Sequence, residues 1–378
     1  MRIAFLLPSE GNIPSGGNKV IYEYANRLSA RGHQVHLIHF ASAEPCRVAR
    51  TLRGKLRPLR YISLAWKGEW RPDNWFKISP LVKDHLIPTP MPILMPRADV
   101  YVAGWWSTAE RLAAMRSLPG RRLYLIQHLE TWAGPEEDVM ATWRMPLEKI
   151  VIARWLQKIA EDLGESSSYI PNGLDLTRFG CDIPPESRSA AHLAMMYNDR
   201  VDWKGSPDGV AALGLLKARF PQLEADVFGV HERPETLPPW ITYWQQPSQK
   251  DLRGIYNRAS IFLAPSHSEG WGLPPCEAMA CGAAVVATDI GGHREFCIDE
   301  KTALLVPMQD PAAMASAAAR LIENALLRVQ IARDSREHIQ SFTWDDAVDA
   351  FERLLLSPGV PRQTARAASL VGATSAKP

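Results

Sequence analysis

Two glutamates on either side of a glycine- and proline-rich loop are the most chemically suggestive residues in this sequence. The stretch SHSEGWGLPPCEAMACGAAVVATD, residues 266–289, carries them as Glu269 and Glu277. Two carboxylates can act as acid and base on one bond, or each can accept hydrogen bonds from a ligand's hydroxyl groups. An isolated glutamate is most often a solvated surface residue, so the surrounding residues must decide between these uses.

The residues between the two glutamates favour a phosphate site. The glycines of EGWG let backbone N–H groups approach a ligand closely. Pro274 and Pro275 suit the first turn of a helix over PPCEAMAC, which Gly282 ends, and the N-terminus of such a helix attracts phosphate. Because the helix starts between the two carboxylates, we expect Glu269 on the loop before it and Glu277 in its first turn. They need not act as a face-to-face acid and base pair.

Alternating strands and helices position this loop. In the first half, strands are predicted for RIAFLL, QVHLIHF, DVYVAGWW, RLYLIQH and KIVIARW, the first followed by a helix that stops at Gly32. In the second half, HLAMMY, EADVFGV, SIFLAPS and AAVVATD alternate with helices over PDGVAALGLLKARF and QKDLRGIYNRA. This alternation predicts an α/β fold with parallel sheets covered on both faces.

The length of 378 residues predicts two domains, because it exceeds what one ordinary core requires. The composition shifts near SYIPNGLDLTRF and the Pro-rich CDIPPESRSA, so we place the first domain at 1–169 and the second at 170–342. The amphipathic helix in 343–358 is expected to pack back on the first domain. The Ser-, Ala- and Arg-rich tail 359–378 is expected to be disordered.

Charge and cysteine content exclude several classes of protein. Lys and Arg total 43 against 41 Asp and Glu, and a net charge of +2 gives no bulk attraction to nucleic acid. Five scattered cysteines without a C-x-x-C pair argue against a disulfide framework and a zinc site. The N-terminus lacks a signal-peptide core and no apolar run is long enough to span a bilayer, so we expect a cytoplasmic protein that meets a membrane only at its surface.

Four motifs in order along the chain resemble the retaining glycosyltransferases of family 4, which have the GT-B fold of two Rossmann-like domains facing across a cleft. SEGWGLPPCEAMACGAAVVATDIGG resembles their E-x7-E signature, and IPSGG resembles their N-terminal glycine loop. PNGLD (171–175) resembles their P-N-G-x-D turn, and VDWKGSPDG their Lys-Gly donor motif. The similarity spans nearly the whole chain and is weakest over 41–98.

The resemblance implies a role for each matching residue. Glu269 would hold donor-sugar hydroxyls, Glu277 would accept from ribose hydroxyls, and Lys204 would neutralise the donor diphosphate. His128 closes a predicted strand at the edge where similar enzymes place a histidine against the donor sugar. We therefore expect Glu269, His128 and Lys204 to be catalytic. The expected donor-binding residues are Gly16, Gly17, Asn172, Arg200, Lys204, Gly270, Trp271, Gly272, Leu273 and Glu277.

Plainer explanations exist for most of these residues. Lys204 could be a solvated lysine, His128 a structural histidine, and Gly16 and Gly17 an ordinary turn between a strand and a helix. Arg200 precedes Lys204 by four residues, one fewer than the spacing common in the family.

The resemblance also implies the reaction class: sugar transfer from a nucleotide-sugar donor with retention of anomeric configuration, in polysaccharide or glycoconjugate biosynthesis. No D-x-D motif occurs, so we expect neither a metal ion nor another cofactor. UDP-, GDP- and dTDP-linked donors remain equally open, and the acceptor would be a glycan or a lipid-linked glycan. A hydrolase with paired carboxylates is disfavoured by the helix start between them, whereas a non-catalytic sugar-nucleotide-binding protein of the same fold stays the alternative.

A basic, aromatic segment lies in the lobe that receives the acceptor in this family. RVARTLRGKLRPLR (47–60) carries six cations and no acid, and it is followed by Trp66, Trp70, Trp75 and Phe76. Segment 47–76 could contact an anionic membrane or lipid-linked acceptor, or close over a soluble glycan with its tryptophans stacked on sugar. The two interpretations are equally supported, and a plain solvated face is the third.

Overall fold

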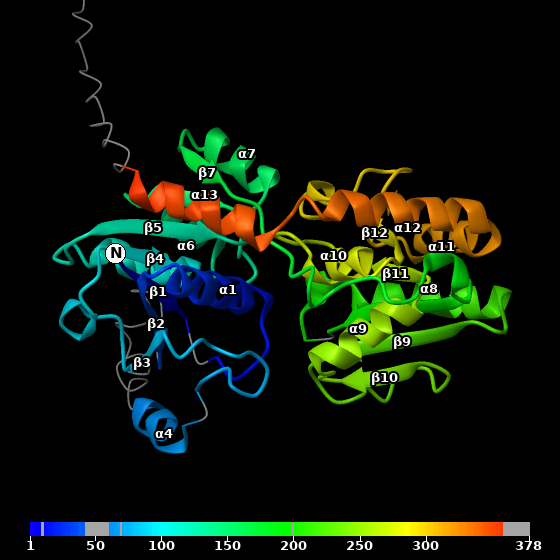
Figure 1. Cartoon of the computed structure of the whole chain (residues 1–378), viewed down its shortest axis with the longest axis horizontal. Coiled ribbons are helices and arrows are strands. Elements are labelled where there is room, and N and C mark those ends of the chain that lie inside the picture. The colour runs from blue at the N-terminus through cyan, green and yellow to red at the C-terminus, as the bar shows by residue number, and fades with distance from the viewer. Residues whose placement is uncertain (9–10, 42–59, 69, 199, 358–378) are drawn as a thin grey trace, which may run out of the picture.

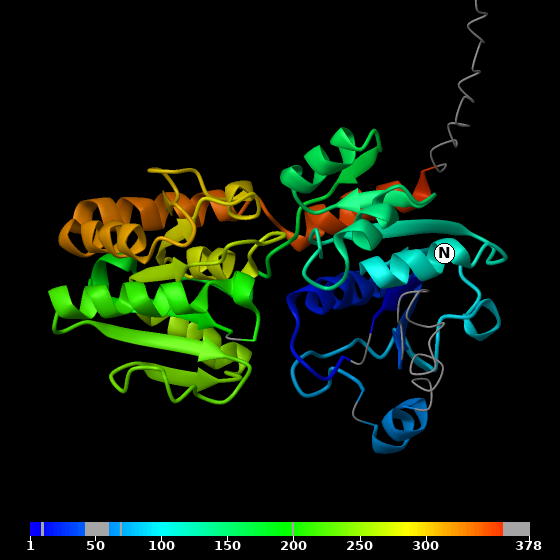
Figure 2. The same cartoon turned by 180° about the vertical axis from the view of Figure 1, so that it is seen from behind.

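The computed structural model consists of two α/β lobes side by side (Figures 1 and 2). It describes residues 1–8, 11–41, 60–68, 70–198 and 200–357. Most of the basic segment 47–60 and the tail 359–378 therefore lie outside the described residues. Within the described part, no helix is long and apolar enough to cross a membrane.

The first lobe is built on a seven-stranded sheet in the order β3-β2-β1-β4-β5-β6-β7. Every pair of neighbouring strands is parallel; Ile3 of β1, for example, lies opposite Val35 of β2 and Val100 of β4. The central strands are buried apolar runs, as expected of a sheet covered on both faces. The strands are β1 (Arg2–Leu7), β2 (Gln34–Phe40), β3 (Lys83–Ile87), β4 (Val100–Ala103), β5 (Arg121–Ile126), β6 (Glu148–Val151) and β7 (Ser167–Tyr169).

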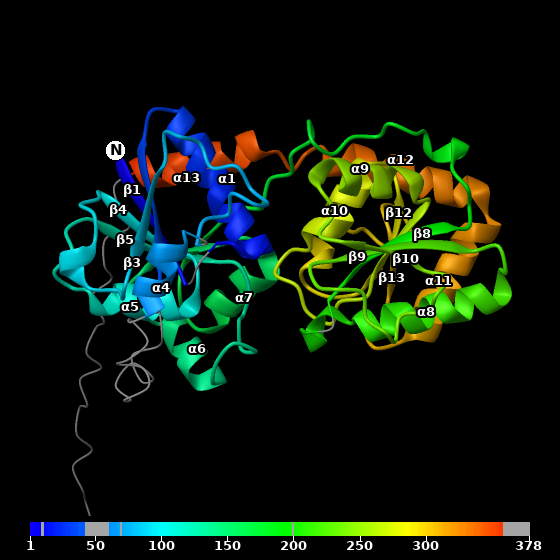
Figure 3. The ribbon, with the colours of Figure 1, turned by 90° about the horizontal axis from the view of Figure 1, so that it is seen from below.

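Helices cover both faces of this sheet. Figure 3 shows α1 and α13 on one side of it and α5 and α6 on the other. The final helix α13 packs on the first lobe, because its Phe351 contacts Phe5 of β1 and Tyr24 of α1. The helices of this lobe are α1 (Gly16–Ala30), α4 (Arg60–Lys67), η2 (Pro92–Leu94), α5 (Trp106–Ala114), α6 (Glu136–Trp143), α7 (Arg154–Asp162) and α13 (Trp344–Leu356).

The second lobe has a six-stranded parallel sheet in the order β10-β9-β8-β11-β12-β13. Helices α8 and α11 cover one face, and α9, α10 and α12 cover the other (Figure 3). The strands are β8 (His192–Tyr197), β9 (Glu224–Gly229), β10 (Thr242–Gln245), β11 (Ile261–Ala264), β12 (Ala284–Thr288) and β13 (Leu304–Val306). The helices are η3 (Pro185–Ser187), η4 (Asp202–Lys204), α8 (Ser206–Arg219), α9 (Gln249–Arg258), α10 (Leu273–Ala280), η5 (His293–Glu295), α11 (Pro311–Glu323) and α12 (Ala325–Ile339).

The two parallel-sheet lobes confirm the predicted α/β fold, but two predicted strands are too long. The strand expected over 149–155 ends at Val151, and Arg154 already begins α7. The strand expected over 99–106 ends at Ala103, and Trp106 already begins α5. Gly104 lies against Ile21 of α1, where a Cβ atom would overlap the isoleucine side chain. The close approach of α1 therefore ends β4, a tertiary constraint that the apolar run VYVAGWW does not reveal.

The chain crosses between the two lobes twice, and the two crossing segments lie side by side. Leu174 on the first crossing pairs with Thr343 on the second, and the Leu174 N–H donates to the Phe342 carbonyl over 2.9 Å. Gly173 lies directly on the start of α13, where a Cβ atom would come within 2.5 Å of the Trp344 nitrogen. The crossings thus need glycine at this position.

We predict that Gly173→Ala lowers the free energy of unfolding by about 1–3 kcal/mol, because the backbone of Trp344 cannot move aside freely. Gly214→Ala is the matched control. Gly214 is exposed within α8 and a Cβ atom there would meet open space, so this change should raise the free energy of unfolding by about 0.5–1 kcal/mol. Urea unfolding followed by circular dichroism measures both. Equal stability of Gly173→Ala and the parent protein would contradict the tight crossing.

Candidate functional site

The loop between β11 and α10 carries Glu269 to the junction of the lobes. Gly272 caps α10 with φ of 106°, a conformation that favours glycine, and proline occupies the first turn as the sequence predicts. The helix begins at Leu273, one residue earlier than expected. Glu277 is consequently its fifth residue and starts the second turn, so the expectation of a first-turn position was wrong.

Glu269 forms an ion pair with Lys204 in the second lobe. Lys204 Nζ lies 2.7 Å from Glu269 Oε1, and the Ser266 hydroxyl donates to the same oxygen over 2.8 Å. Only 11% of the Glu269 side chain is exposed. Burial raises the pKa of Glu269, but attraction and hydrogen bonding from Lys204 outweigh it and hold the pKa below its usual range. The carboxylate is therefore ionised and acts as an acceptor at neutral pH.

The turn that carries Lys204 needs its following glycine. Gly205 has φ of 60°, and a Cβ atom there would overlap the Pro265 carbonyl at the end of β11. This contact brings the turn after β8 against the loop after β11. Lys204 Nζ also lies 4.2 Å from the centroid of the Trp203 ring, a favourable cation–π distance.

Glu277 makes a second ion pair, this time between the lobes. Lys19 of α1 places Nζ 2.6 Å from Glu277 Oε1, and the Tyr256 hydroxyl donates to Oε2 over 3.0 Å. The Glu277 side chain is 4% exposed. The sequence interpretation missed Lys19, whose only signal was its position in the first turn after Gly16 and Gly17.

His128 lies between the lobes beside Glu269. Its Nδ1 is 3.4 Å from the Glu130 N–H and its Nε2 is 3.2 Å from the Ser268 hydroxyl. Since Nδ1 accepts, the neutral ring carries its proton on Nε2. Burial lowers the pKa of His128 to about 4, with Lys204 also lowering it and Glu269 opposing the shift. His128 is neutral near pH 7.

The glycine loops of the two lobes meet at Gln127, which the sequence interpretation also missed. Its side-chain amide donates to the Gly17 carbonyl over 3.2 Å. Gly270 approaches the Gln127 carbonyl so closely that a Cβ atom would overlap it. On the other side, Gly16 faces the Leu273 side chain. These predicted glycines are thus brought together at the start of α10.

Three other predicted donor residues lie in different surroundings. The Trp271 side chain is buried against Phe342 and Phe296, with ring centroids 5.3 and 6.0 Å away, so its backbone is the part left to face a ligand. Asn172 is buried, and its Oδ1 has no hydrogen-bond partner among the described residues. Arg200 is exposed in the turn after β8, where its backbone N–H donates to Asn198.

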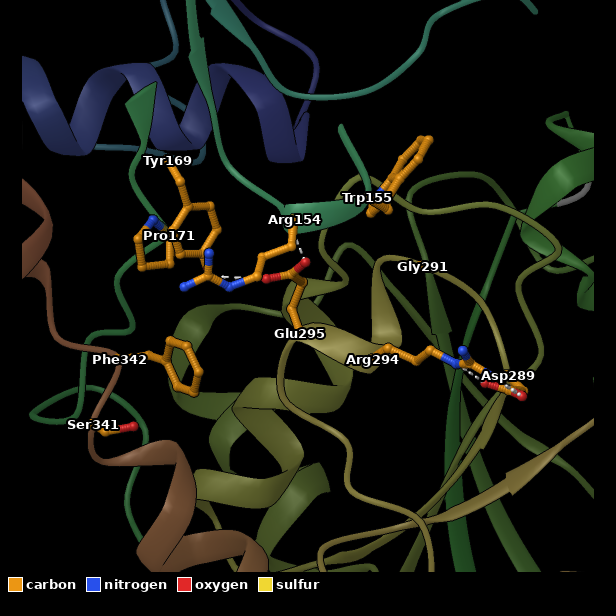
Figure 4. Close-up of a pocket in the computed structure, with 10 residues that line it drawn as sticks. All are labelled: Arg154, Trp155, Tyr169, Pro171, Asp289, Gly291, Arg294, Glu295, Ser341 and Phe342. Carbon is orange, nitrogen blue, oxygen red and sulfur yellow. Dashed lines mark hydrogen bonds and ion pairs between the residues drawn. The ribbon is translucent and has the colours of Figure 1, made fainter. Parts of the chain in front are cut away.

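A cavity of about 920 Å³ lies where the chain crosses between the lobes (Figure 4). Arg154, Trp155 and Tyr169 line it from the first lobe, and Gly291 and Glu295 from the second. It adjoins the Glu269 loop, because the Trp155 indole donates to the Gly270 carbonyl over 3.2 Å. Its charged groups are largely satisfied internally: Glu295 accepts from the Arg154 backbone and the Tyr169 hydroxyl.

Among the described residues, no group of three or more His, Cys, Asp or Glu side chains could hold a metal ion. Positive groups near Glu269 and Glu277 include the ammonium groups of Lys204 and Lys19 and the N-terminus of α10, and Arg154 and Arg294 line the adjoining cavity.

Comparisons with known proteins agree with the fold. Residues 198–324 match the family model described as "Glycosyl transferases group 1". The sucrose-phosphate synthase of Thermosynechococcus elongatus is 18% identical, with a TM-score of 0.71 over 94% of this chain and 98% of that structure. Anabaena HepE in complex with UDP-glucose is 16% identical, with a TM-score of 0.67 over 93% of this chain and 98% of that one. The fold is GT-B, as predicted.

Two curated relatives carry named activities. The D-inositol 3-phosphate glycosyltransferase of Saccharomonospora viridis is 28% identical over 252 residues, which cover 57% of this chain and 56% of the relative. The phosphatidyl-myo-inositol mannosyltransferase of Mycolicibacterium smegmatis is 30% identical over 196 residues, 49% of this chain and 50% of the relative. The chain thus spans about half the length of these relatives. Together with the family model, these matches support a group 1 glycosyltransferase.

We predict that the His128 ring titrates near pH 4 in the folded protein, against an ordinary value of about 6.5. Because the unfolded chain binds this proton more tightly, His128 should contribute a loss of stability as the pH falls from about 6.5 towards 4. NMR titration of the histidine Cε1 protons measures it, and His128→Gln assigns the resonance by its disappearance. A midpoint near 6.5 would contradict the buried, neutral histidine.

Proposed function

We propose that this protein is a retaining, metal-independent glycosyltransferase that moves a sugar from a nucleotide-sugar donor to a glycan or lipid-linked glycan. The observation that carries the proposal is the pair Lys204–Glu269 beside His128, at the point where the loops of both lobes meet. A cation for a diphosphate and an acceptor for sugar hydroxyls lie 2.7 Å apart there.

Donor binding would replace the internal ion pairs with ligand contacts. The diphosphate would bind to Lys204 and the N-terminus of α10, which supply positive charge without a metal ion. Glu269 would then be free to accept from the donor-sugar hydroxyls, and Glu277 from the ribose hydroxyls in place of Lys19. Neutral His128, with its proton on Nε2, would donate to the sugar as a hydrogen-bond partner and not as a charged acid.

The chemical step transfers the sugar from phosphate to the acceptor on one face. The bond between the anomeric carbon and the phosphate oxygen breaks, the acceptor oxygen bonds to that carbon from the same face, and the departing phosphate takes the acceptor proton. Lys204 and the α10 N-terminus stabilise the negative charge that develops on the departing group. In this proposal Glu269 orients the sugar and forms no covalent intermediate.

The donor nucleotide is proposed as UDP, GDP or dTDP, with UDP favoured because the similarly folded HepE binds UDP-glucose. The curated relatives are named for an inositol phosphate acceptor and a phosphatidylinositol acceptor. A hydroxyl-bearing acceptor in glycoconjugate synthesis is thus consistent with both.

We predict that Glu269→Gln and Lys204→Ala each lower kcat by about 100-fold or more while the protein stays folded. Each removes one preorganised contact to the donor. Circular dichroism checks that each variant is folded, because the Lys204 and Glu269 side chains are only 17% and 11% exposed. Turnover is measured as the release of nucleoside diphosphate in the presence of a cell extract that supplies the acceptor.

Glu300→Gln and Lys158→Ala are the matched controls, since both residues form exposed ion pairs, with Arg320 and Asp162, that include no proposed site residue. They should turn over like the parent protein. Near-parental turnover by both site variants would show that the assignment is wrong.

Peripheral contact with an anionic membrane is the second part of the proposal. On α4, Ile62 and Trp66 are four residues apart on one face and are 65% and 88% exposed. Five of the six cations of 47–60 precede this helix in the sequence, and the sixth, Arg60, begins it. An exposed apolar helix face next in the sequence to a run of cations is a combination that binds anionic lipid, which would bring a lipid-linked acceptor within reach.

We predict that Ile62→Ser with Trp66→Ser abolishes binding to vesicles of phosphatidylcholine and phosphatidylglycerol at low salt, because it removes the apolar contact. Vesicle co-sedimentation measures the binding. Leu326→Ser is the control: this residue of α12 is 86% exposed on the other lobe. Absence of vesicle binding by the parent protein would leave 47–76 as a solvated or glycan-covering segment.

A further inference from the structure

Three tryptophans, Trp132, Trp155 and Trp203, contact the His128 ring next to the proposed donor site, and Trp105 contacts Trp132. Trp105 follows β4, Trp132 lies in the loop after β5, and Trp203 precedes Lys204 in the other lobe. The Trp132 and Trp203 rings lie 5.5 Å apart at 39°, and Trp105 meets Trp132 edge-on at 5.3 Å. The His128 ring lies 5.2 Å from Trp203 and 6.3 Å from Trp132. The cluster therefore joins the two lobes beside the groups assigned to the donor sugar.

Trp132 is exposed although its loop is firmly anchored. Buried Glu130 accepts from the Trp106 N–H over 2.7 Å and has φ of 42°, an uncommon conformation for a glutamate. Gly134 packs directly on the Trp106 ring. Between these anchors, Trp132 leaves 48% of its surface exposed. A large aromatic side chain held in place at the junction of the lobes, and not covered by the core, is suited to contact a ligand.

Trp203 adds an unsatisfied hydrogen-bond donor. Its indole Nε1 is buried and has no partner among the described residues. A buried N–H without a partner is unfavourable, and such groups in native proteins usually have a functional or water-mediated explanation. A hydroxyl oxygen from a ligand placed between the lobes would satisfy it.

We propose that Trp132 and Trp203 form the binding site for a neutral sugar ring of the acceptor. This inference rests on the proposed transferase function. The apolar C–H face of a pyranose would stack on the Trp132 indole, and a ring hydroxyl would accept from the Trp203 indole N–H. The acceptor is assigned here because Trp132 and Trp105 come from the first lobe, whereas Lys204 and Glu269 hold the donor from the second.

Charge around the cluster favours a neutral sugar over a phosphorylated polyol. The cation in contact with the cluster is Lys204, whose Nζ lies 4.2 Å from the Trp203 ring and 2.7 Å from Glu269, and the proposed donor diphosphate takes it. An anionic acceptor at the cluster would then face Glu269 and the aromatic rings. In this proposal the acceptor of this chain differs from that of the curated relatives whose name gives D-inositol 3-phosphate as the acceptor.

Saturation-transfer difference NMR on the full chain tests the site by binding alone. The probes are methyl α-D-glucopyranoside, methyl α-D-mannopyranoside and methyl N-acetyl-β-D-glucosaminide, each with UDP or GDP present, and D-myo-inositol 3-phosphate as the anionic comparison. We expect saturation of the ring C–H protons of at least one glycoside. Trp132→Ala should weaken that binding about tenfold or more, whereas Trp132→Phe keeps most of it.

The variant Trp203→Phe tests the contribution of the indole N–H separately from that of the aromatic ring. It preserves the aromatic face beside Lys204 but removes the donor, so glycoside affinity should fall below that of the parent protein. Circular dichroism confirms that each variant is folded, and Trp132 tolerates change because it is half exposed.

The outcomes also separate this site from the proposed function. No saturation of any glycoside, unchanged binding in Trp132→Ala, or equal binding of the inositol phosphate would overturn the sugar site. Transfer by the parent protein together with any of those results would leave the transferase function standing. If Trp132→Ala loses glycoside binding but the parent protein transfers no sugar from any donor to any acceptor, the result would support the sugar site and contradict the transferase function.

Discussion

The structure at the junction of the lobes depends on the neutralisation of two largely buried carboxylates. An ionised carboxylate removed from water is costly unless a cation and hydrogen bonds compensate it. Glu269 is compensated within its own lobe by Lys204, and Glu277 across the interface by Lys19. The second pair links α1 to α10, and Gly270 lies close to the Gln127 carbonyl, where the loops of the two lobes meet. A donor diphosphate that competes for these lysines would therefore act on the donor site and on the approach of the lobes together.

Much of the second lobe and its site could be predicted, because the signals there are local. The helix start at the two prolines, the left-handed glycines after Lys204 and before Leu273, and the alternation of strands are each encoded within a few residues. Lys19, Gln127 and the tryptophans could not be found in this way. Lys19, Gln127 and Trp132 each contact a residue more than 70 positions away: Glu277 for Lys19, Gly17 for Gln127 and Trp203 for Trp132. Pairings at this distance depend on how two sheets face each other, which no sequence window contains.

The proposed substrates enter from different parts of the molecule. In the proposal the donor is held mainly by the second lobe, through Lys204, Glu269 and the start of α10, with His128 of the first lobe against its sugar. The acceptor sugar would be held by Trp132 of the first lobe and a lipid carrier by α4, which Figure 1 places at the far end of that lobe from α13. The cavity of Figure 4 lies at the two crossings, so movement of one lobe against the other must change its shape. One junction would thus align both substrates as the lobes approach.

The most direct test of the central claim is one transfer reaction in excess EDTA, with the anomeric coupling of the product measured by NMR. Positive charge from Lys204 and the α10 N-terminus, with Glu269 orienting the sugar, predicts undiminished transfer and a product with the donor's anomeric configuration. Loss of transfer on chelation, or a product of inverted configuration, would contradict it.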